Sequence, residues 1–173
     1  MRRTISTLVI AALAVSLSGC GAGHNASTRQ VNQVTDGVEA SITKDGNNIK
    51  IVNLLVVAAP GGNAVLVGTI VNNGDNDDSL LGVAINGSTA NYSGNSVLPK
   101  NTPIIFEGNS ANAKAVLAGF GGSAGSRVKV GLFFARAGEI TLDAIVRDTR
   151  DTYAGVTAGE NLATPTPSPT AKK

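Results

Sequence analysis

Two apolar runs in the second half of the chain share a period of two residues. In residues 128–134 apolar side chains occupy every second position, with Lys129 between two of them, and residues 140–146 repeat the pattern around Asp143. This period puts alternate side chains on opposite faces of a β-strand, so one face is buried and the other meets water. A turn centred on Gly138 separates the runs. The pattern therefore predicts a hairpin that covers a core.

Further short apolar runs, separated by turn signals, precede this hairpin. Residues 49–58 end at Pro60 and two glycines, and residues 64–71 lead into the Asn- and Asp-rich stretch 72–78. Residues 54–58 are apolar on both strand faces, which is typical of strands inside a sandwich. Aromatic residues make up only 3% of the chain, so branched aliphatic residues must build most of the core. About seven such strands favour an all-β fold, an immunoglobulin-like β-sandwich.

Composition divides the chain into four segments. Residues 1–19 hold an apolar run behind two arginines, and residues 20–46 are small and polar. Residues 47–150 contain the strand-like runs, and residues 151–173 end in the sequence ATPTPSPTAKK. We predict a signal peptide, a flexible lipid-anchored tether, one β-sandwich domain and a Pro/Thr-rich disordered tail, in that order.

The first segment resembles the signal peptide of a bacterial lipoprotein. Arg2 and Arg3 precede an apolar run over residues 5–17, which is shorter than the roughly 20 residues that a membrane-spanning helix needs. The run ends in LSGC, a branched apolar residue and two small residues before Cys20. This is the lipobox pattern, in which the small residues leave the backbone open to the peptidase and the cysteine receives a diacylglyceryl group.

Cys20 is the only cysteine of the chain. A disulfide would lack a partner within the chain, and a metal site would need further ligands close by. We therefore predict that Cys20 is lipidated, with an ordinary secretory signal as the alternative. Two acyl chains such as palmitate hold a protein stably on a membrane. The expected location is the extracytoplasmic face of the cell membrane, with the lipid as the attachment.

The charge balance argues against a nucleic-acid partner. The chain has 14 Lys and Arg against 12 Asp and Glu, and the excess is Arg2 and Arg3 of the predicted signal peptide. A mature chain near neutrality offers no basic stripe for a phosphate backbone.

The residue types most used in catalysis and metal binding are nearly absent. The one Met, one His and one Cys are Met1, His24 and Cys20. A Ser-His-Asp triad needs an ordered histidine, and a soft-metal site needs several Cys, His or Met ligands. We expect no catalytic residue, no metal site, no cofactor and no enzymatic activity. An enzyme without His or Cys, with a carboxylate pair around Glu107 or Asp143, is the alternative, although no spacing in the sequence favours such a pair.

The loop over residues 72–79 carries Asp75, Asp77 and Asp78 among asparagines. Carboxylate and amide oxygens are ligands for calcium. The loop lacks the glycine and the closing glutamate at the positions that an EF-hand requires. Asn and Asp are also preferred turn residues, so we expect a plain connection between strands, with calcium binding as the alternative.

A family resemblance emerges from the order of two stretches. VLPKNTPIIFEGNSANAKAVLAGF is followed by SRVKVGLFFARAGEITLDAIVRD, and together they resemble the periplasmic copper chaperone family PCu(A)C over residues 49–148. The resemblance implies a cupredoxin-like sandwich and a copper site of His and Met, with one His-x-Met element near residues 112–115. The chain has NAKA there, so no copper ligand carries over. With its lipobox, the chain is most similar to actinobacterial lipoproteins of the LpqE type.

These observations favour a non-enzymatic binding or assembly module for an envelope protein partner. Rigid sandwiches commonly present binding residues on loops, so the contact candidates are residues 72–79, 87–97 and 119–126. The alternative is an extracytoplasmic metal-handling protein, related to copper chaperones, that has lost the usual Met and His ligands.

Overall fold

The two alternating runs form the hairpin that their period predicts. In the computed structural model, β10 (Arg127–Phe134) pairs antiparallel with β11 (Glu139–Asp148). Val128 and Val130 face the core with exposed fractions of 5% and 0%, and Lys129 between them is exposed. The prediction of a hairpin with one buried face is therefore confirmed.

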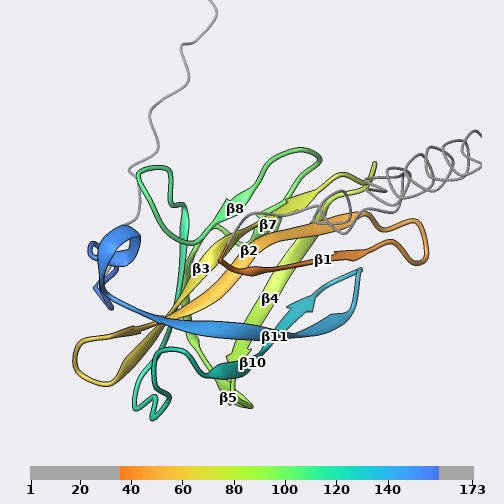
Figure 1. Cartoon of the computed structure of the whole chain (residues 1–173). Helices are drawn as coiled ribbons and strands as arrows, with labels where there is room; N and C mark the ends of the chain where they lie inside the picture. Colours follow the sequence, from red (N-terminus) through yellow and green to blue (C-terminus); the bar gives the residue numbers. More distant parts are fainter. Residues whose placement is uncertain (1–35, 160–173) are drawn as a thin grey trace, which may run out of the picture. The chain divides into compact units, whose positions relative to one another are not determined.

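The structure describes residues 36–159, which are all-β apart from one short 3-10 helix (Figure 1). In this part of the chain one sheet holds eleven strands, more than the seven expected. Three of them span two residues each, which is too short to leave a pattern in the sequence. Besides β10 and β11, the elements are β1 (Val38–Ile42), β2 (Ile49–Ala59), β3 (Asn63–Asn72), β4 (Asp78–Ile85), β5 (Ser88–Thr89), β6 (Asn91–Gly94), β7 (Val97–Leu98), β8 (Ile104–Ile105), β9 (Ala113–Leu117) and the 3-10 helix η1 (Asp151–Tyr153).

Strand β2 joins the early and late parts of the chain. On one side it pairs antiparallel with β3, from Ile49 opposite Asn72 to Ala59 opposite Asn63. On the other side its first half pairs antiparallel with β1 and its second half pairs parallel with β11, where Val56 lies opposite Val146. The centre of the sheet therefore depends on contacts between residues that are far apart in sequence.

The two ends of the sheet are consecutive in sequence. The pairing order is β5-β4-β10-β11-β2-β3-β9-β6, so its outermost strands are β5 and β6. Only Ala90 separates them; it is 5% exposed, and its N–H donates to the carbonyl of Val83 at 2.9 Å. The chain thus crosses directly from one end of the sheet to the other, and the sheet is nearly closed around its core.

Two apolar clusters lie on the two faces of β2. The larger one fills the interior of the sheet and includes Leu54 and Val56, and the smaller one lies on the outer face and includes Leu55 and Val57. These four residues are all 0% exposed. The sequence suggested that strands inside a sandwich explain this run of apolar residues. The structure gives another reason, because the outer face is covered by Val156 near the end of the described chain.

Two segments outside the expected domain limits of 47 and 150 belong to the fold. Strand β1 falls within the segment 20–46 that was assigned to a tether, and its Ala40 and Ile42 pack against the interior cluster. Val156 falls within the segment assigned to the tail. Neither segment shows a clear period of its own, so tertiary contacts rather than local pattern decide their conformation.

The segments 1–35 and 160–173 lie outside the described residues. They include the predicted signal peptide, Cys20 and most of the predicted tail. Within residues 36–159, no helix has the length and apolar character needed to cross a membrane.

Candidate functional site

The outer face of the sheet is crossed by residues 151–159, which we call the C-terminal strap. It begins with η1, where the N–H of Tyr153 donates to the carbonyl of Arg150 at 3.0 Å. The N–H of Val156 then donates to the carbonyl of Tyr153 at 3.0 Å. The side chains of Tyr153 and Val156 pack on the cluster that contains Leu55 and Val65. The strap is thus fixed to β2 and β3 by apolar contacts.

A pocket of about 410 Å³ lies between the C-terminal strap and the sheet. We call it the strap pocket. Its wall combines apolar and polar groups, which is typical of small-molecule sites, although this pocket is at the lower end of their size range. Its main contributors are Asn53 of β2, Val67 of β3, Glu107 and Asn109 of the loop between β8 and β9, and Tyr153 and Gly155 of the strap.

A β-bulge brings Asn53 to the strap pocket. The register of β2 against β3 shifts between Val52 and Leu55, and Asn53 has a φ of 53°. The backbone N–H of Gly37 donates to Oδ1 of Asn53 at 2.8 Å. A Cβ on Gly37 would lie 2.4 Å from the backbone carbon of Asn53, so only glycine allows this approach. Bulges of this kind are common beside functional sites because they redirect a side chain.

A buried ion pair lies beside the strap pocket. Nζ of Lys114 is 3.0 Å from Oε1 of Glu107, and the two side chains are 3% and 12% exposed. The contact lacks the angular geometry of a hydrogen bond, so charge and proximity hold the pair. Lys and Glu are seldom buried unless they are paired. The Glu107 carboxylate therefore lines the pocket with its charge already balanced.

Tyr153 also forms the wall of a second pocket, of about 500 Å³. Here Nη2 of Arg147 lies 2.7 Å from Oδ2 of Asp36, and the hydroxyl of Tyr153 donates to the same oxygen at 3.1 Å. The hydrogen bond from Arg147, aided by that from Tyr153, lowers the pKa of Asp36. Burial is the main cause that raises the pKa of Tyr153, and the hydrogen bond to Asp36 also raises it. These contacts tie the strap to both β11 and the residues that precede β1.

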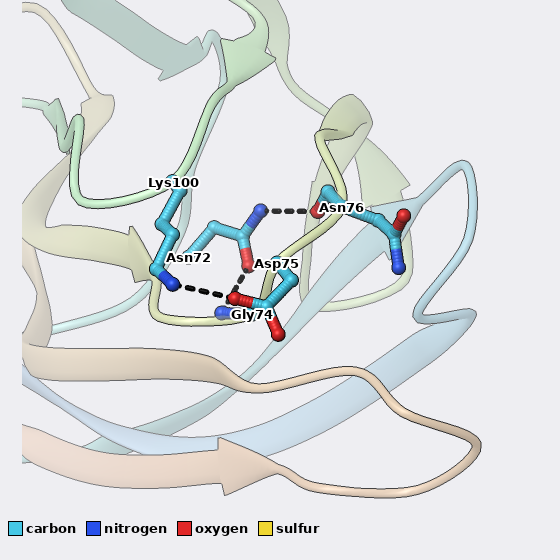
Figure 2. Close-up of polar contacts among 5 residues, drawn as sticks. All are labelled: Asn72, Gly74, Asp75, Asn76 and Lys100. Carbon is cyan, nitrogen blue, oxygen red and sulfur yellow. Dashed lines mark hydrogen bonds and ion pairs between the residues drawn. The ribbon is translucent and has the colours of Figure 1, made fainter.

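The loop predicted as a turn or a calcium site is organised by Asn72 (Figure 2). The Asn72 side chain is buried, and its amide donates to the carbonyls of Asn76 and Leu98 at 2.8 and 2.9 Å. Its Oδ1 accepts from the N–H of Gly74 at 2.9 Å. Asp75 points to Lys100, whose Nζ lies 2.5 Å from its carboxylate. This ion pair lowers the pKa of Asp75, mainly through its hydrogen bond.

The carboxylate of Asp78 is used for another purpose. Its Oδ1 accepts from the N–H groups of Ser79 and Arg136 at 2.7 and 2.9 Å, and its Oδ2 accepts from the N–H of Ala137 at 2.9 Å. Asp78 therefore fixes the turn between β10 and β11. No cluster of three or more acidic, His or Cys side chains suited to a metal occurs in residues 36–159.

Residues 112–115, where the resemblance led us to expect a His-x-Met element, have structural contacts in this chain. Asn112 donates to the carbonyl of Pro103 and accepts from the N–H of Ile105, both at 2.9 Å. Ala113 and Ala115 are 0% exposed in the core. Lys114, between them, forms the ion pair with Glu107.

The three loops expected to contact a partner are spread over the molecule. Residues 119–126 lie at the beginning of β3, where the N–H of Phe120 donates to the carbonyl of Gly62 at 2.7 Å. Residues 72–79 follow the end of β3, roughly 30 Å away at the rise of an extended strand. The stretch 87–97 includes β5 and β6 and runs between the two ends. The loops therefore cannot form one joint surface.

The two carboxylates named for the enzymatic alternative lie on different elements. Glu107 is paired with Lys114, whereas Asp143 lies on β11 opposite Lys129. Glu107 was expected only as a possible member of a carboxylate pair, and no role was expected for Tyr153 or Asn53. Tyr153 had a weak signal, because it is one of two tyrosines and follows the last predicted strand. Asn53 also left a weak signal, because an asparagine within an apolar run is unusual in a strand and tolerates a positive φ.

Comparisons with protein-family models and with curated proteins found no match. Solved structures do resemble the chain. A "Copper-bound PCuAC domain from PmoF2" is 24% identical with a TM-score of 0.53, and the match covers 64% of this chain and 98% of that domain. An "Apo PCuAC domain from PmoF1" is 25% identical with a TM-score of 0.53, covering 64% of this chain and 99% of that domain. The chain therefore contains a domain that is structurally similar to PCuAC domains.

Proposed function

We propose that this chain is an exported lipoprotein that acts as a non-enzymatic binding module of the cell envelope. The lipobox ending at Cys20 supports the anchor and the extracytoplasmic location. The actinobacterial LpqE-type identity and the immunoglobulin-like or cupredoxin-like sandwich class belong to the same proposal. The likeness to PCuAC domains supports the sandwich class.

The observation that carries the binding role is the strap pocket. It combines a bulged strand, a charge-balanced carboxylate and an aromatic side chain on one face of the sheet. The residues around it are held by contacts outside the pocket, as Tyr153 is by Asp36. A rigid concave surface with polar groups suits recognition, and residues 36–159 contain no His, Cys or Met to perform nucleophilic or redox chemistry there.

The anchor is tested by the mass of the protein. Expressed from its full reading frame in an actinobacterial host, the chain should partition into detergent, and its intact mass should match a start at Cys20 plus a diacylglyceryl group. The variant Cys20→Ala should leave the membrane fraction. A soluble wild-type chain of unmodified mass would contradict the anchor.

The binding role is tested by crosslinking in the cell. A photoreactive residue at Thr152, which lines the strap pocket, should yield a defined adduct in the membrane fraction. The matched control carries the same residue at Thr141, an exposed position on β11 outside the pocket and outside the three candidate loops. Equal adducts from both positions, or none from either, would contradict a binding site at the strap.

Copper handling is the second candidate function, supported by the likeness to a copper-bound PCuAC domain. Its ligands would have to differ from the His and Met set of the family. Titration of the full-length protein with Cu(I) and Cu(II), against a competing chelator, should show stoichiometric binding if this function is correct. A flat titration for both ions would exclude it and leave the binding module.

A further inference from the structure

The groups of the strap pocket define the kind of molecule that it can hold. Glu107 offers a carboxylate, and Asn53 and Asn109 offer amides that both donate and accept. Val67 and Val156 form an apolar floor, and Tyr153 adds an aromatic wall. A ligand with hydroxyl groups on its edge and an apolar face would satisfy all of these groups.

The charges around the strap pocket also limit the net charge of a ligand that it can hold. Lys114 already compensates Glu107 at 3.0 Å and is 3% exposed, so its ammonium cannot reach a ligand. A bound anion would meet the carboxylate without a free cation, and a bound cation would lie near the buried ammonium. An anion would therefore be desolvated with no compensating charge, and the attraction of the carboxylate for a cation would be opposed by the ammonium of Lys114. The pocket is therefore suited to an uncharged ligand.

We propose that the strap pocket binds a neutral carbohydrate unit, one sugar ring or a short oligosaccharide. The ring's C–H face would rest on Tyr153 and Val67, and its hydroxyl groups would contact Glu107 and Asn109. The volume of about 410 Å³ lies within the range of small-ligand sites. This inference rests on the proposed function, because it names the ligand of the same binding module.

Gly155 allows the pocket to be filled without disturbing the strap. A Cβ at this position meets no atom within 4 Å, and its φ lies outside the left-handed region. Gly155→Trp should therefore occupy the pocket at little cost in stability. Gly82 of β4 is equally open and lies away from the pocket, so Gly82→Trp is the matched control.

The experiment is an NMR titration of the full-length protein with neutral mono- to tetrasaccharides of glucose, galactose, mannose and arabinose. At least one sugar should shift the amide signals of Glu107–Asn109 and Thr152–Val156. Asn109→Ala should weaken that binding about five- to tenfold, which corresponds to the loss of one hydrogen bond. Gly155→Trp should abolish it, and Gly82→Trp should leave it unchanged.

Three outcomes would overturn the inference. The first is that no sugar of the panel binds, and the second is that binding persists in Gly155→Trp. The third is that a neutral extended peptide binds at the strap and sugars do not. In the last case the crosslink at Thr152 would still form, so the proposed binding function would survive while the carbohydrate assignment failed.

Discussion

At the scale of single residues, Asn72 does more for the fold than its place in a polar turn suggests. It is 2% exposed and satisfies two carbonyls and one N–H, including the carbonyl of Leu98 at 2.9 Å. Removing the amide would leave buried polar groups without partners, and that cost exceeds the value of the hydrogen bonds themselves.

We expect Asn72→Ala to lower the free energy of unfolding by about 1–3 kcal/mol. Chemical denaturation monitored by circular dichroism measures the change. Asn73→Ala is the matched control, since Asn73 is the exposed neighbour in the same loop, and it should change stability by less than about 0.5 kcal/mol. Equal losses in the two variants would show that the Asn72 contacts are not what stabilises the loop.

Tyr92 is the residue whose titration should be visible in stability. Burial raises its pKa to about 12, its hydroxyl donates to the carbonyl of Asn95, and its ring meets Phe106 edge-on at 6.2 Å. A raised pKa means that the folded state holds the proton more tightly than the unfolded state. The contribution is fully present below about pH 10, the unfolded value, and is lost as the pH rises toward 12.

The measurement is the free energy of unfolding of the wild type and of Tyr92→Phe between pH 9 and pH 12. We expect the wild type to lose more stability than the variant over the upper part of this range, because only the wild type carries the ionising phenol. Parallel curves would show that the pKa of Tyr92 is the same in the folded and unfolded states.

At the scale of elements, the C-terminal strap is a short segment in which Val156 is the buried side chain. Val156 is 7% exposed on the outer cluster, and Ala154 in the same segment is exposed. Val156→Asp places a carboxylate against Leu55 and Val65, where no partner compensates it. The strap should detach, while the interior core remains in place.

Limited proteolysis and hydrogen exchange test this expectation. In Val156→Asp, cleavage within residues 151–159 should become at least tenfold faster, with the exchange of β10 and β11 unchanged. Ala154→Asp should behave like the wild type. Global unfolding of Val156→Asp would mean that the strap is part of the cooperative core rather than an addition to its surface.

The elements also show what the sequence could and could not predict. Strands β10 and β11 were predictable because their buried residues are spaced two apart. Val128 and Val130 on β10, and Ala144 and Val146 on β11, all face a single core. Strand β1 was not, because VEASI has mixed polarity and acquires its conformation from pairing with β2. The pair of Lys114 and Glu107 was also out of reach, since a lysine in a strand is usually solvated and its burial is decided by the loop after β8.

At the scale of the whole molecule, the crossing at Ala90 decides whether the sheet is open or nearly closed. Ala90→Asp would bury a carboxylate where the chain passes from β5 to β6. We expect a loss of several kcal/mol, as is usual for an unpaired buried charge, together with loss of amide protection along β6 and β9. Ser88→Asp, an exposed site on β5, is the control and should be nearly neutral.

Hydrogen exchange read by mass spectrometry distinguishes the outcomes. If the crossing closes the sheet, β5 and β6 should lose protection together, although they pair with different neighbours. Independent behaviour of the two strands in Ala90→Asp would mean that closure at this point does not couple them.

The nearly closed sheet also affects how the protein behaves at high concentration. A sheet with long free edges presents unpaired N–H and C=O groups to other chains, and such edges promote aggregation. Here the strands at the two ends of the pairing order, β5 and β6, have two and four residues, and β1, which lies off that order beside β2, has five. Each of these offers only a short template to a second strand. On the membrane surface that we propose for this chain, where copies would be confined to two dimensions, this shape disfavours edge-to-edge polymerisation.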